Sequence, residues 1–381
     1  MLNYICMNIN AGNRQQLVFN GYDVMPLKGI YMQGLVSPAE LQIFKEMKSI
    51  SAKEGFDLFV NQNNHSITTK QNTKIQKDNK LSIWAQDNKA FIKNKIGKVL
   101  LWNSKEPVFN NIAPFNDYKI DAGRYIPRGG NYYLGYKPGG EKWLLINSMS
   151  ITDEKSFETF GDTPTKKHLC ELFDVKPENI YVINEFTSDL DEYVRPIRFP
   201  YILVNDYSAS LKNIEKMRDK FIDSAETYEK LKSYITSQMK NENENPFCES
   251  CDERCQKLKQ FGFKPIKIAG KYADDINFMN ALAFENSNGK LLYITNSTKH
   301  STPDLEYLET LFEKDLRGHI ENIADIYFVS GGKREEAQEF FSRGFAKGNV
   351  IMDVLANRLG GIHCMCSEIP NFDIFTTSSS K

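Results

Sequence analysis

The sequence predicts a single repetitive α/β domain, and three observations support that fold class. Short apolar runs of strand length alternate with amphipathic stretches of helical length along the whole chain. No Pro-, Ser- or Gly-rich linker divides the 381 residues. Hydrophobic residues make up 41% and charged residues 25% of the chain, which is typical of a globular protein. Alternating strands and helices favour one α/β architecture over separate domains, although no sequence repeat of fixed period is visible.

Boundary signals define the elements in the first half of the chain. Ser37, Pro38 and Glu40 form a capping box that starts a helix, and Gly55 ends it. The elements expected up to residue 204 are a helix from 37 to 55, a helix opening at 163–164, strands at 57–60, 81–92, 143–146, 179–183 and 201–204, a solvated loop at 61–80, and loops with short strands at 103–131.

A long helical segment follows. Apolar side chains recur at helical spacing from Leu211 to Met239, which predicts one long amphipathic helix. The polar run 241–246 ends in proline and breaks it, and a shorter helix carrying Cys251 and Cys255 should come next. We therefore expect a helical hairpin at 208–262, inserted into the α/β repeat. The remaining expected elements are strands at 276–284 and 290–295 joined by an Asn288-Gly289 turn, helices at 304–316 and 334–341, and strands at 324–329, 350–355 and 362–366.

Composition excludes several classes of function. The chain has 48 basic and 49 acidic residues, so its net charge of −1 gives no general attraction to nucleic acid or to an anionic membrane. No apolar run reaches the length of a membrane span, and the first residues do not form a signal peptide. We therefore expect a cytoplasmic protein by default, with non-classical export left open. The seven cysteines are then expected to be reduced thiols.

Three segments far apart in the sequence carry chemically useful side chains. They contain Trp84 and Asp87, then Asp189 and Asp191, and finally Cys364 after a glycine pair. Each has an ordinary alternative: a surface acid for Asp87, a solvated loop or a metal site for the second acidic run, and a core residue for the cysteine. Together they supply a thiol nucleophile and carboxylates that can bind a planar cation.

That combination suits chemistry on a guanidinium group. Its fork of N–H donors allows two carboxylates to bind it bidentately, and a tryptophan can cover its flat face. Attack by a cysteine thiolate on the guanidinium carbon gives a covalent intermediate that water then resolves.

The ordered set W-x-Q-D, D-L-D-E-Y and G-G-I-H-C resembles the catalytic domain of protein-arginine deiminases, in the guanidine-modifying (pentein, amidinotransferase-like) superfamily. The resemblance extends from about residue 18 to about residue 370, and Gly129-Gly130-Asn131 is a weaker match to a glycine motif of the family. The G-I-H-C-M run also resembles the nucleophile segment of free-arginine and agmatine deiminases. The resemblance implies a five-bladed, pseudo-symmetric α/β propeller of ββαβ modules over 1–381, with its site in the central channel.

The resemblance also implies residue roles. Cys364 corresponds to the nucleophile, Asp87 and Asp191 to the carboxylates that hold the guanidinium, and Trp84 to the wall of the substrate pocket. Asp189 occupies the position of the family's catalytic histidine. An ionised Asp cannot stabilise a thiolate, whereas a protonated one can still donate a proton.

Two classes of function follow. We expect a guanidine-modifying hydrolase that acts on arginine in a peptide or protein, or on a small guanidino compound, through a thiouronium intermediate on Cys364. Its activity is impaired or altered where Asp189 replaces histidine. The alternatives are a catalytically inactive guanidinium-binding protein and an amidino-group transferase.

No histidine is an obvious substitute for the missing one. His363 adjoins Cys364, but neighbouring residues of an extended strand point to opposite faces. His319 follows a helix, where a loop or core role outweighs an approach to the site. The other three are expected in loops or on helix surfaces: His65, His168 and His300.

A cysteine cluster gives a separate candidate site. Cys248, Cys251 and Cys255 share one face of a helix and could hold zinc, but a closed zinc site needs four ligands. The alternative is a row of thiols packed against the long helix. No loop argues for calcium, and no cofactor is predicted.

Overall fold

The structure is a computed structural model. It describes residues 27–33, 38–62, 73–77, 89–94, 97–102, 119–121, 129–137, 141–153, 156, 163–184, 189–221, 225–286, 291–298, 305–320, 323–330 and 362–370. Several predictions lie outside the described residues: Trp84, Asp87, the helix at 334–341 and the strand at 350–355.

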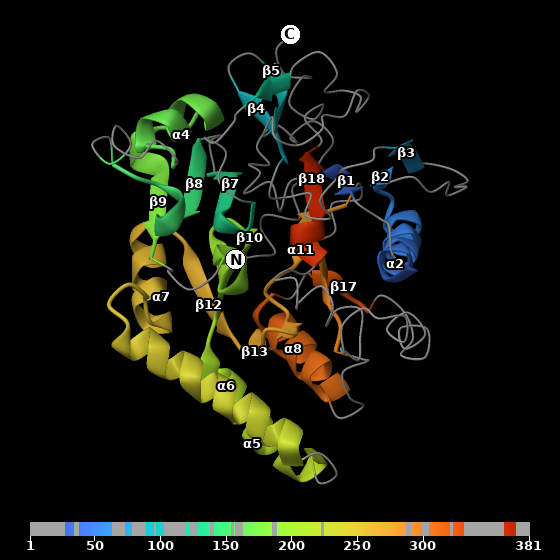
Figure 1. The fold of residues 1–381 in the computed structure, drawn as a ribbon, viewed down its shortest axis with the longest axis vertical. Coiled ribbons are helices and arrows are strands. Elements are labelled where there is room, and N and C mark those ends of the chain that lie inside the picture. Colours follow the sequence, from blue (N-terminus) through green and yellow to red (C-terminus); the bar gives the residue numbers. More distant parts are fainter. Residues whose placement is uncertain are drawn as a thin grey trace.

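Five sheets in the described part of the chain repeat one three-strand pattern (Figure 1). The first strand pairs antiparallel with the second, and the second pairs parallel with the third. The sheets are β4(Lys89–Asn94)-β5(Gly97–Trp102)-β6(Lys119–Asp121), β7(Tyr132–Tyr136)-β8(Lys142–Asn147)-β9(Ile180–Ile183), β10(Val194–Arg198)-β11(Tyr201–Asn205)-β12(Lys264–Ile268), β15(Leu282–Glu285)-β16(Leu291–Asn296)-β17(Ile323–Val329) and β18(Cys366–Pro370)-β1(Leu27–Gln33)-β2(Asp57–Gln62), the last extended by β3(Thr73–Lys77).

A parallel pair needs a crossover connection, and helices supply it in four of these sheets. The helices of the described residues are α2(Pro38–Glu54), α4(Lys166–Phe173), α5(Tyr207–Lys216), α6(Ala225–Glu244), α7(Cys251–Gln260), α8(Glu306–His319) and α11(Ile362–Met365). One crossover holds α4 alone, whereas another holds α5, α6 and α7 in succession. The repeat is therefore structural, and its unequal crossovers explain why no fixed sequence period is visible.

One of these sheets joins segments from the two ends of the described chain. β18 runs antiparallel to β1, with Leu27 opposite Pro370 and Met32 opposite Cys366. β1 then pairs parallel with β2 across α2. The segment that precedes β18 is thereby held against the rest of the fold.

Many predicted boundaries are confirmed. α2 begins at Pro38 and ends at Glu54, where Gly55 adopts a φ of 74° that favours glycine. The predicted strands at 57–60, 143–146, 179–183, 201–204 and 324–329 correspond to β2, β8, β9, β11 and β17. None of the helices in the described residues is long and apolar enough to cross a membrane.

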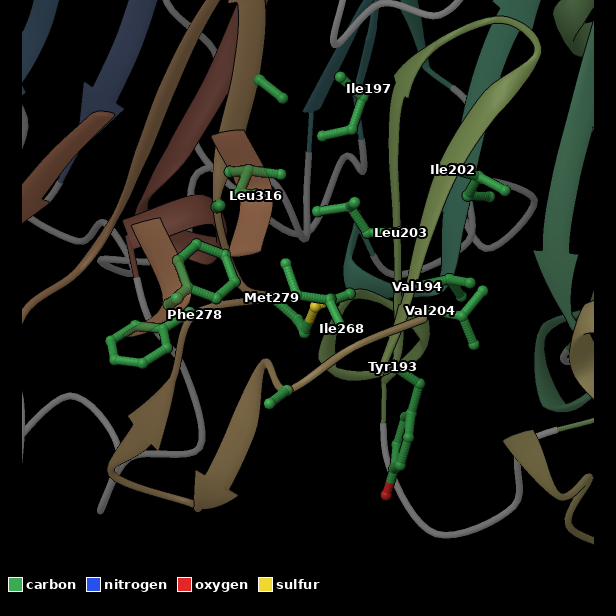
Figure 2. Packing of buried hydrophobic residues seen from close by; sticks show 14 of the residues in the cluster. Tyr193, Val194, Ile197, Ile202, Leu203, Val204, Ile268, Phe278, Met279 and Leu316 are labelled. Atoms are coloured by element: carbon green, nitrogen blue, oxygen red, sulfur yellow. The ribbon is translucent and has the colours of Figure 1, made fainter. Parts of the chain in front are cut away.

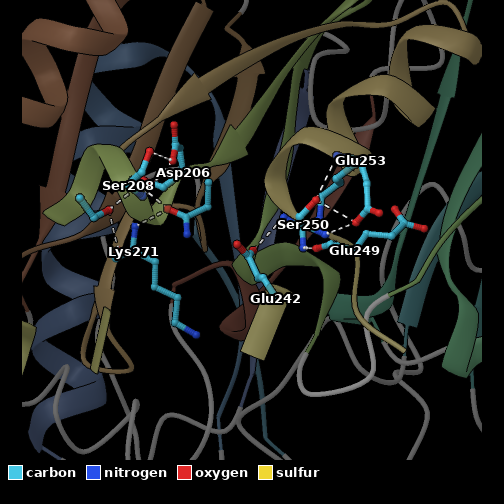
Figure 3. Close-up of polar contacts among 11 residues, drawn as sticks. Asp206, Ser208, Glu242, Glu249, Ser250, Glu253 and Lys271 are labelled. Atoms are coloured by element: carbon cyan, nitrogen blue, oxygen red, sulfur yellow. Dashed lines mark hydrogen bonds and ion pairs between the residues drawn. The ribbon is translucent and has the colours of Figure 1, made fainter. Parts of the chain in front are cut away.

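The prediction of one helix from Leu211 to Met239 is wrong, because the segment forms α5 and α6. Asp206 caps α5 by accepting hydrogen bonds from the backbone N–H groups of Ser208 and Ala209 (Figure 3). The chain leaves this helix at Met217, and a short 3-10 turn, η8(Arg218–Phe221), follows. Both helices keep their apolar stripe on the core, so periodicity alone did not reveal the break. The sequence signal for a new start was Ser224, a residue favoured at N-caps.

α7 is joined to its surroundings by polar contacts (Figure 3). Ser250 and Glu253 form a capping box at its start. The buried Arg254 donates to a carboxylate oxygen of Glu242 on α6 at 3.3 Å. Glu249 accepts from the backbone N–H of residue 184, directly after β9, at 3.0 Å. In Figure 1, α6 and α7 lie along one side of the molecule beside β12 and β13(Lys271–Ala273).

Two strand predictions also need correction. Residues 61–80, expected as a solvated loop, include β3, which pairs parallel with β2 despite its polar sequence. Residues 276–284, expected as one strand, divide into β14(Ile276–Asn277) and β15. β14 pairs with β13, whereas β15 pairs with β16, so the intervening residues 278–281 turn between two sheets.

The largest hydrophobic cluster lies between these sheets and the helices. It combines strand residues with aromatic and aliphatic side chains of α8 and of the 278–281 turn (Figure 2). Phe278 packs against Phe312 in a tilted arrangement with ring centroids 4.9 Å apart and forms an edge contact with Tyr272. Full burial of side chains such as Ile202 and Leu203 contributes about 1.5–3 kcal/mol each. This core includes side chains of β7, β10 and β15, and the segments just before these three strands form part of the candidate site.

Candidate active site

Four segments that each precede the first strand of a sheet meet at the candidate site. They are η4(Gly129–Asn131) before β7, η7(Leu190–Glu192) before β10, the turn containing Asn280 before β15, and α11 before β18. Hydrogen bonds connect η4 with η7, η7 with Asn280, and both of the latter with α11. The repeated topology thus brings four segments, from Gly130 at one end of the sequence range to His363 at the other, into one cluster.

The η4 turn contacts the acidic segment through Asn131. Its Nδ2 donates to Asp189 Oδ1 at 2.5 Å, and its own Oδ1 accepts from Asn147 Nδ2 at 2.8 Å. Gly130 lies so close that an added Cβ would be 2.9 Å from the Cβ of Asp189 and 3.0 Å from Asp191 Oδ1. Only glycine allows this approach, which gives a physical reason for the second glycine of the Gly129-Gly130-Asn131 motif.

Asp191 is the buried carboxylate of the cluster, with 0% exposure. Its Oδ2 accepts from Asn280 Nδ2 at 2.8 Å and lies 2.8 Å from His363 Nδ1. A buried carboxylate is costly without hydrogen bonds, and these two groups each supply one to Oδ2. The predicted guanidinium ligand is therefore held by the segment that carries the predicted nucleophile.

The segment 362–365 is a helical turn, so the prediction of a strand at 362–366 is wrong. The backbone N–H of Ile362 donates to Asn296 Oδ1 at 2.9 Å, and that of His363 donates to Asn280 Oδ1 at 3.0 Å. These side chains satisfy the N–H groups that a first helical turn leaves without an intrahelical partner. The alternation argument against His363 fails for the same reason.

His363 is fully buried beside Asp191. Its ring stacks on Tyr133 at a centroid distance of 5.9 Å, and the Arg195 guanidinium lies 5.4 Å from the same tyrosine ring. Burial and the positive charge of Arg195 hold the pKa of His363 well below its usual value. A neutral imidazole with its proton on Nδ1 can donate to the Asp191 carboxylate.

An ion pair between Lys271 and Glu192 holds the end of η7. The ammonium group of Lys271 contacts the Glu192 carboxylate and lies 3.4 Å from Asp274. Tyr193 packs its ring 5.4 Å from the same ammonium group. Although burial opposes its charge, Glu192 holds the pKa of Lys271 well above its usual value. Asn205 Oδ1 accepts from the Lys271 backbone N–H at 2.8 Å, which ties the base of this lysine to the end of β11.

The structure brings together Asp189, Asp191 and the backbone of the turn that contains Cys364. Trp84 and Asp87 lie outside the described residues. Of the other histidines, His168 closes the N-terminus of α4, and His319 lies at the exposed end of α8 near Asp315. His65 and His300 lie outside the described residues.

Cys251 and Cys255 lie on α7, but Cys248 precedes that helix, so the prediction that the three cysteines share one helix face is wrong. In the described part of the chain, no group of three or more His, Cys, Asp or Glu side chains is arranged to hold a metal ion. Cys255 is buried in the main core, and Cys251 packs against it. The hydrogen bond between them raises the pKa of the Cys251 thiol, as burial also does, and it lowers the pKa of Cys255 although burial acts in the opposite direction.

Sequence reasoning missed Asn280, Asn296, Tyr133 and Arg195. A signal for one of them was present: the middle strands β8, β11 and β16 all end in asparagine, followed by Ser or Asp. Their carboxamide oxygens accept from backbone N–H groups of neighbouring segments. No comparable pattern marked Asn280, whose partners are 89 and 83 residues away.

Comparison with known proteins supports the fold. No protein-family model matches the sequence, and no curated protein sequence matches it. The chain is similar to the structure of C. jejuni agmatine deiminase, with a TM-score of 0.50, 14% identity, and coverage of 93% of this chain and 96% of that chain. It is also similar to the N-terminal domain of ArgZ covalently bound to a reaction intermediate, with a TM-score of 0.39, 11% identity, and coverage of 89% and 97%. An apo structure of ArgZ, an arginine dihydrolase from the ornithine-ammonia cycle in cyanobacteria, gives a TM-score of 0.37 and 10% identity, with 90% of this chain and 38% of that chain covered. At 14% identity, the first of these similarities shows that the two chains share a mixed α/β fold.

Proposed function

We propose that the protein is a guanidine-modifying hydrolase of the pentein superfamily that uses Cys364 as its nucleophile. One observation carries the proposal: Asp191 is linked to the α11 turn that contains Cys364. It contacts His363 of that turn directly, and Asn280 forms a second link by hydrogen-bonding both Asp191 and the His363 backbone. The acidic segment and the cysteine segment of the family resemblance therefore belong to one cluster, although more than 170 residues separate them.

The proposed site is completed by Asp87 and Trp84. Four modules contribute the segment before their first strand, and in the sequence Asp87 occupies the same place two residues before β4. This position supports five ββαβ modules arranged as a five-bladed propeller, with one site at the centre. The single domain would span 1–381, with the helices between β11 and β12 as its insertion.

The reaction balances as two displacements. The Cys364 thiolate forms a bond to the guanidinium carbon, the C–N bond to a terminal nitrogen breaks, and ammonia leaves with a proton from the site. Water then adds to the thiouronium carbon, the C–S bond breaks, and a ureido product and the thiol are formed. Carboxylates hold the guanidinium in place by accepting its N–H bonds.

Asp189 is the proposed proton donor and acceptor in place of histidine. Asn131 donates to Asp189 Oδ1 at 2.5 Å, which holds the carboxyl group in the cluster. A carboxylic acid is a weaker base than imidazole near neutral pH, so we expect slow turnover with an acidic optimum. The proposed substrates are arginine in a peptide or protein, as in protein-arginine deiminases, or a small guanidino compound.

A second candidate is a guanidinium-binding protein without turnover. Asp189 in place of histidine favours it, and so does the engagement of Asp191 Oδ2 by two protein donors. An amidino-group transferase is the third candidate, in which the amine rather than ammonia leaves.

Turnover of three probes tests the proposal: agmatine, L-arginine and an arginine-containing peptide. Ammonia and ureido product are measured for the wild type, for Cys364→Ser and for the matched control Cys170→Ser, a free thiol on α4. The proposal predicts ureido product from at least one probe, lost in Cys364→Ser and kept in Cys170→Ser. Product formation that survives in Cys364→Ser, or binding of a probe with no product, would reject the hydrolase.

A further inference from the structure

We propose that Asn280 is a positioning residue whose carboxamide fixes the Asp191 carboxylate relative to the α11 turn that carries Cys364. The inference rests on the function proposed above. One side chain would set the distance between the acidic segment that contains Asp191 and the turn that contains Cys364.

The geometry of the Asn280 carboxamide uses both of its ends. Nδ2 donates to Asp191 Oδ2 at 2.8 Å, and Oδ1 accepts from the backbone N–H of His363 at 3.0 Å. The side chain is 4% exposed, so water competes little for either bond. A carboxylate partner requires a donor and an N–H partner requires an acceptor, so the two contacts also fix which end is nitrogen. Neither an ionised Asp nor an aliphatic residue can satisfy both.

The backbone of Asn280 is itself anchored. Its N–H donates to Asn277 Oδ1 at 3.4 Å, and its C=O accepts from Asn296 Nδ2 at 3.5 Å. Phe278 and Met279 on the same turn are fully buried in the main cluster. Asn280 is therefore a fixed link between η7 and α11. Its segment precedes β15, just as the other site segments precede the first strands of their sheets.

Asn296 provides a matched control. Its Oδ1 accepts from the Ile362 N–H at 2.9 Å, and its Nδ2 donates to the Asn277 carbonyl at 2.7 Å. It thus supports the same helical turn as Asn280, with its hydrogen bonds directed to backbone groups and none to Asp191. A change at 296 reports the effect of loosening α11 and the Asn280 backbone without directly removing the hydrogen bond between Asn280 and Asp191.

The test is Asn280→Asp, compared with Asn296→Asp. A carboxyl group at 280 still accepts from His363, but it faces Asp191 at hydrogen-bonding distance. Two carboxyl groups so close share one proton. The singly protonated pair keeps the hydrogen bond between residue 280 and Asp191, whereas in the doubly ionised pair the two carboxylates repel each other. In Asn280→Asp, the link between Asp191 and the α11 turn should therefore be lost only as the pH rises through the elevated pKa of the carboxyl pair.

The readout is the alkylation rate of Cys364 by iodoacetamide, measured by peptide mass spectrometry from about pH 5 to about pH 9. This readout needs no turnover, so it separates failure of the positioning role from failure of the proposed hydrolase. The ratio of the Asn280→Asp rate to the Asn296→Asp rate should change by about tenfold across this range, the equivalent of one lost charge-assisted hydrogen bond. A ratio that stays constant would overturn the proposal.

A second variant covers a failure of Asn280→Asp to fold, which circular dichroism would show. Asn280→Ala removes both hydrogen bonds without adding a charge. Its alkylation rate should differ from that of Asn296→Ala by a similar factor at every pH. Equal rates in the two alanine variants would mean that the link to Asp191 has no effect on the cysteine turn, and would also overturn the proposal.

Discussion

Replacing Glu192 by Gln should destabilise the fold much more than replacing its partner Lys271 by Met. Lys271 is 2% exposed, whereas Glu192 retains 24% exposure. Loss of the glutamate charge leaves a buried ammonium group, but loss of the ammonium group leaves a carboxylate that water can reach. The two halves of one ion pair therefore have different costs on removal.

The magnitude follows from the surroundings of the ammonium group. Removing one partner of a buried pair costs about 3–5 kcal/mol. Asp274 lies 3.4 Å from Lys271 but is 69% exposed, so it offsets no more than a surface partner would, about 0–1 kcal/mol. The Gln carbonyl recovers roughly one neutral hydrogen bond of about 1 kcal/mol. We expect Glu192→Gln to cost about 2–3 kcal/mol and Lys271→Met about 0–1 kcal/mol, because Met retains the packing against Tyr193.

Urea unfolding at neutral pH, followed by circular dichroism, measures both changes. The double variant Glu192→Gln with Lys271→Met completes the cycle, and its cost should be close to that of Lys271→Met alone. Equal costs for the two single variants, or a larger cost for Lys271→Met, would refute the reasoning from burial.

Three further predictions concern the candidate site. Gly130→Ala should reduce turnover or guanidine binding by about tenfold or more, because its Cβ would come within 3.0 Å of both Asp189 and Asp191; a titration calorimetry signal equal to wild type would contradict this. His363 has a lowered folded-state pKa from burial and Arg195, so the unfolded chain binds a proton there that the folded chain does not. The stability present above about pH 6.5 is therefore lost as pH falls, by about 1.4 kcal/mol per pH unit, relative to His363→Gln, and parallel pH curves for the two proteins would rule this out. Asp189→His should raise turnover of the preferred guanidino probe in a steady-state assay, and no gain in a folded variant would show divergence beyond that position.

Local signals in the sequence were sufficient for much of the scaffold. The end of α2 at the glycine that follows it and the apolar run of β8 are determined by neighbouring residues, and the structure has both at the predicted places. The alternation of strands and helices also gave the fold class. The acidic and cysteine segments were connected through family resemblance rather than through any local pattern.

The features that could not be predicted depend on distant partners. The helical turn at 362–365 needs acceptors from Asn280 and Asn296, which lie 83 and 66 residues away in the sequence. Without those acceptors the apolar run favours a strand. The break between α5 and α6 was missed because the apolar stripe continues across it in phase.

The account depends most directly on a covalent bond between Cys364 and the guanidinium carbon. Acid-quenched protein, incubated in turn with agmatine, L-arginine and the arginine peptide, should be measured by intact mass and peptide mapping. The account predicts an adduct on Cys364 whose mass is that of one probe less ammonia, absent in Cys364→Ser. An adduct carrying only the amidino group would indicate transfer instead, and turnover with no Cys364 adduct under any quench condition would contradict the account.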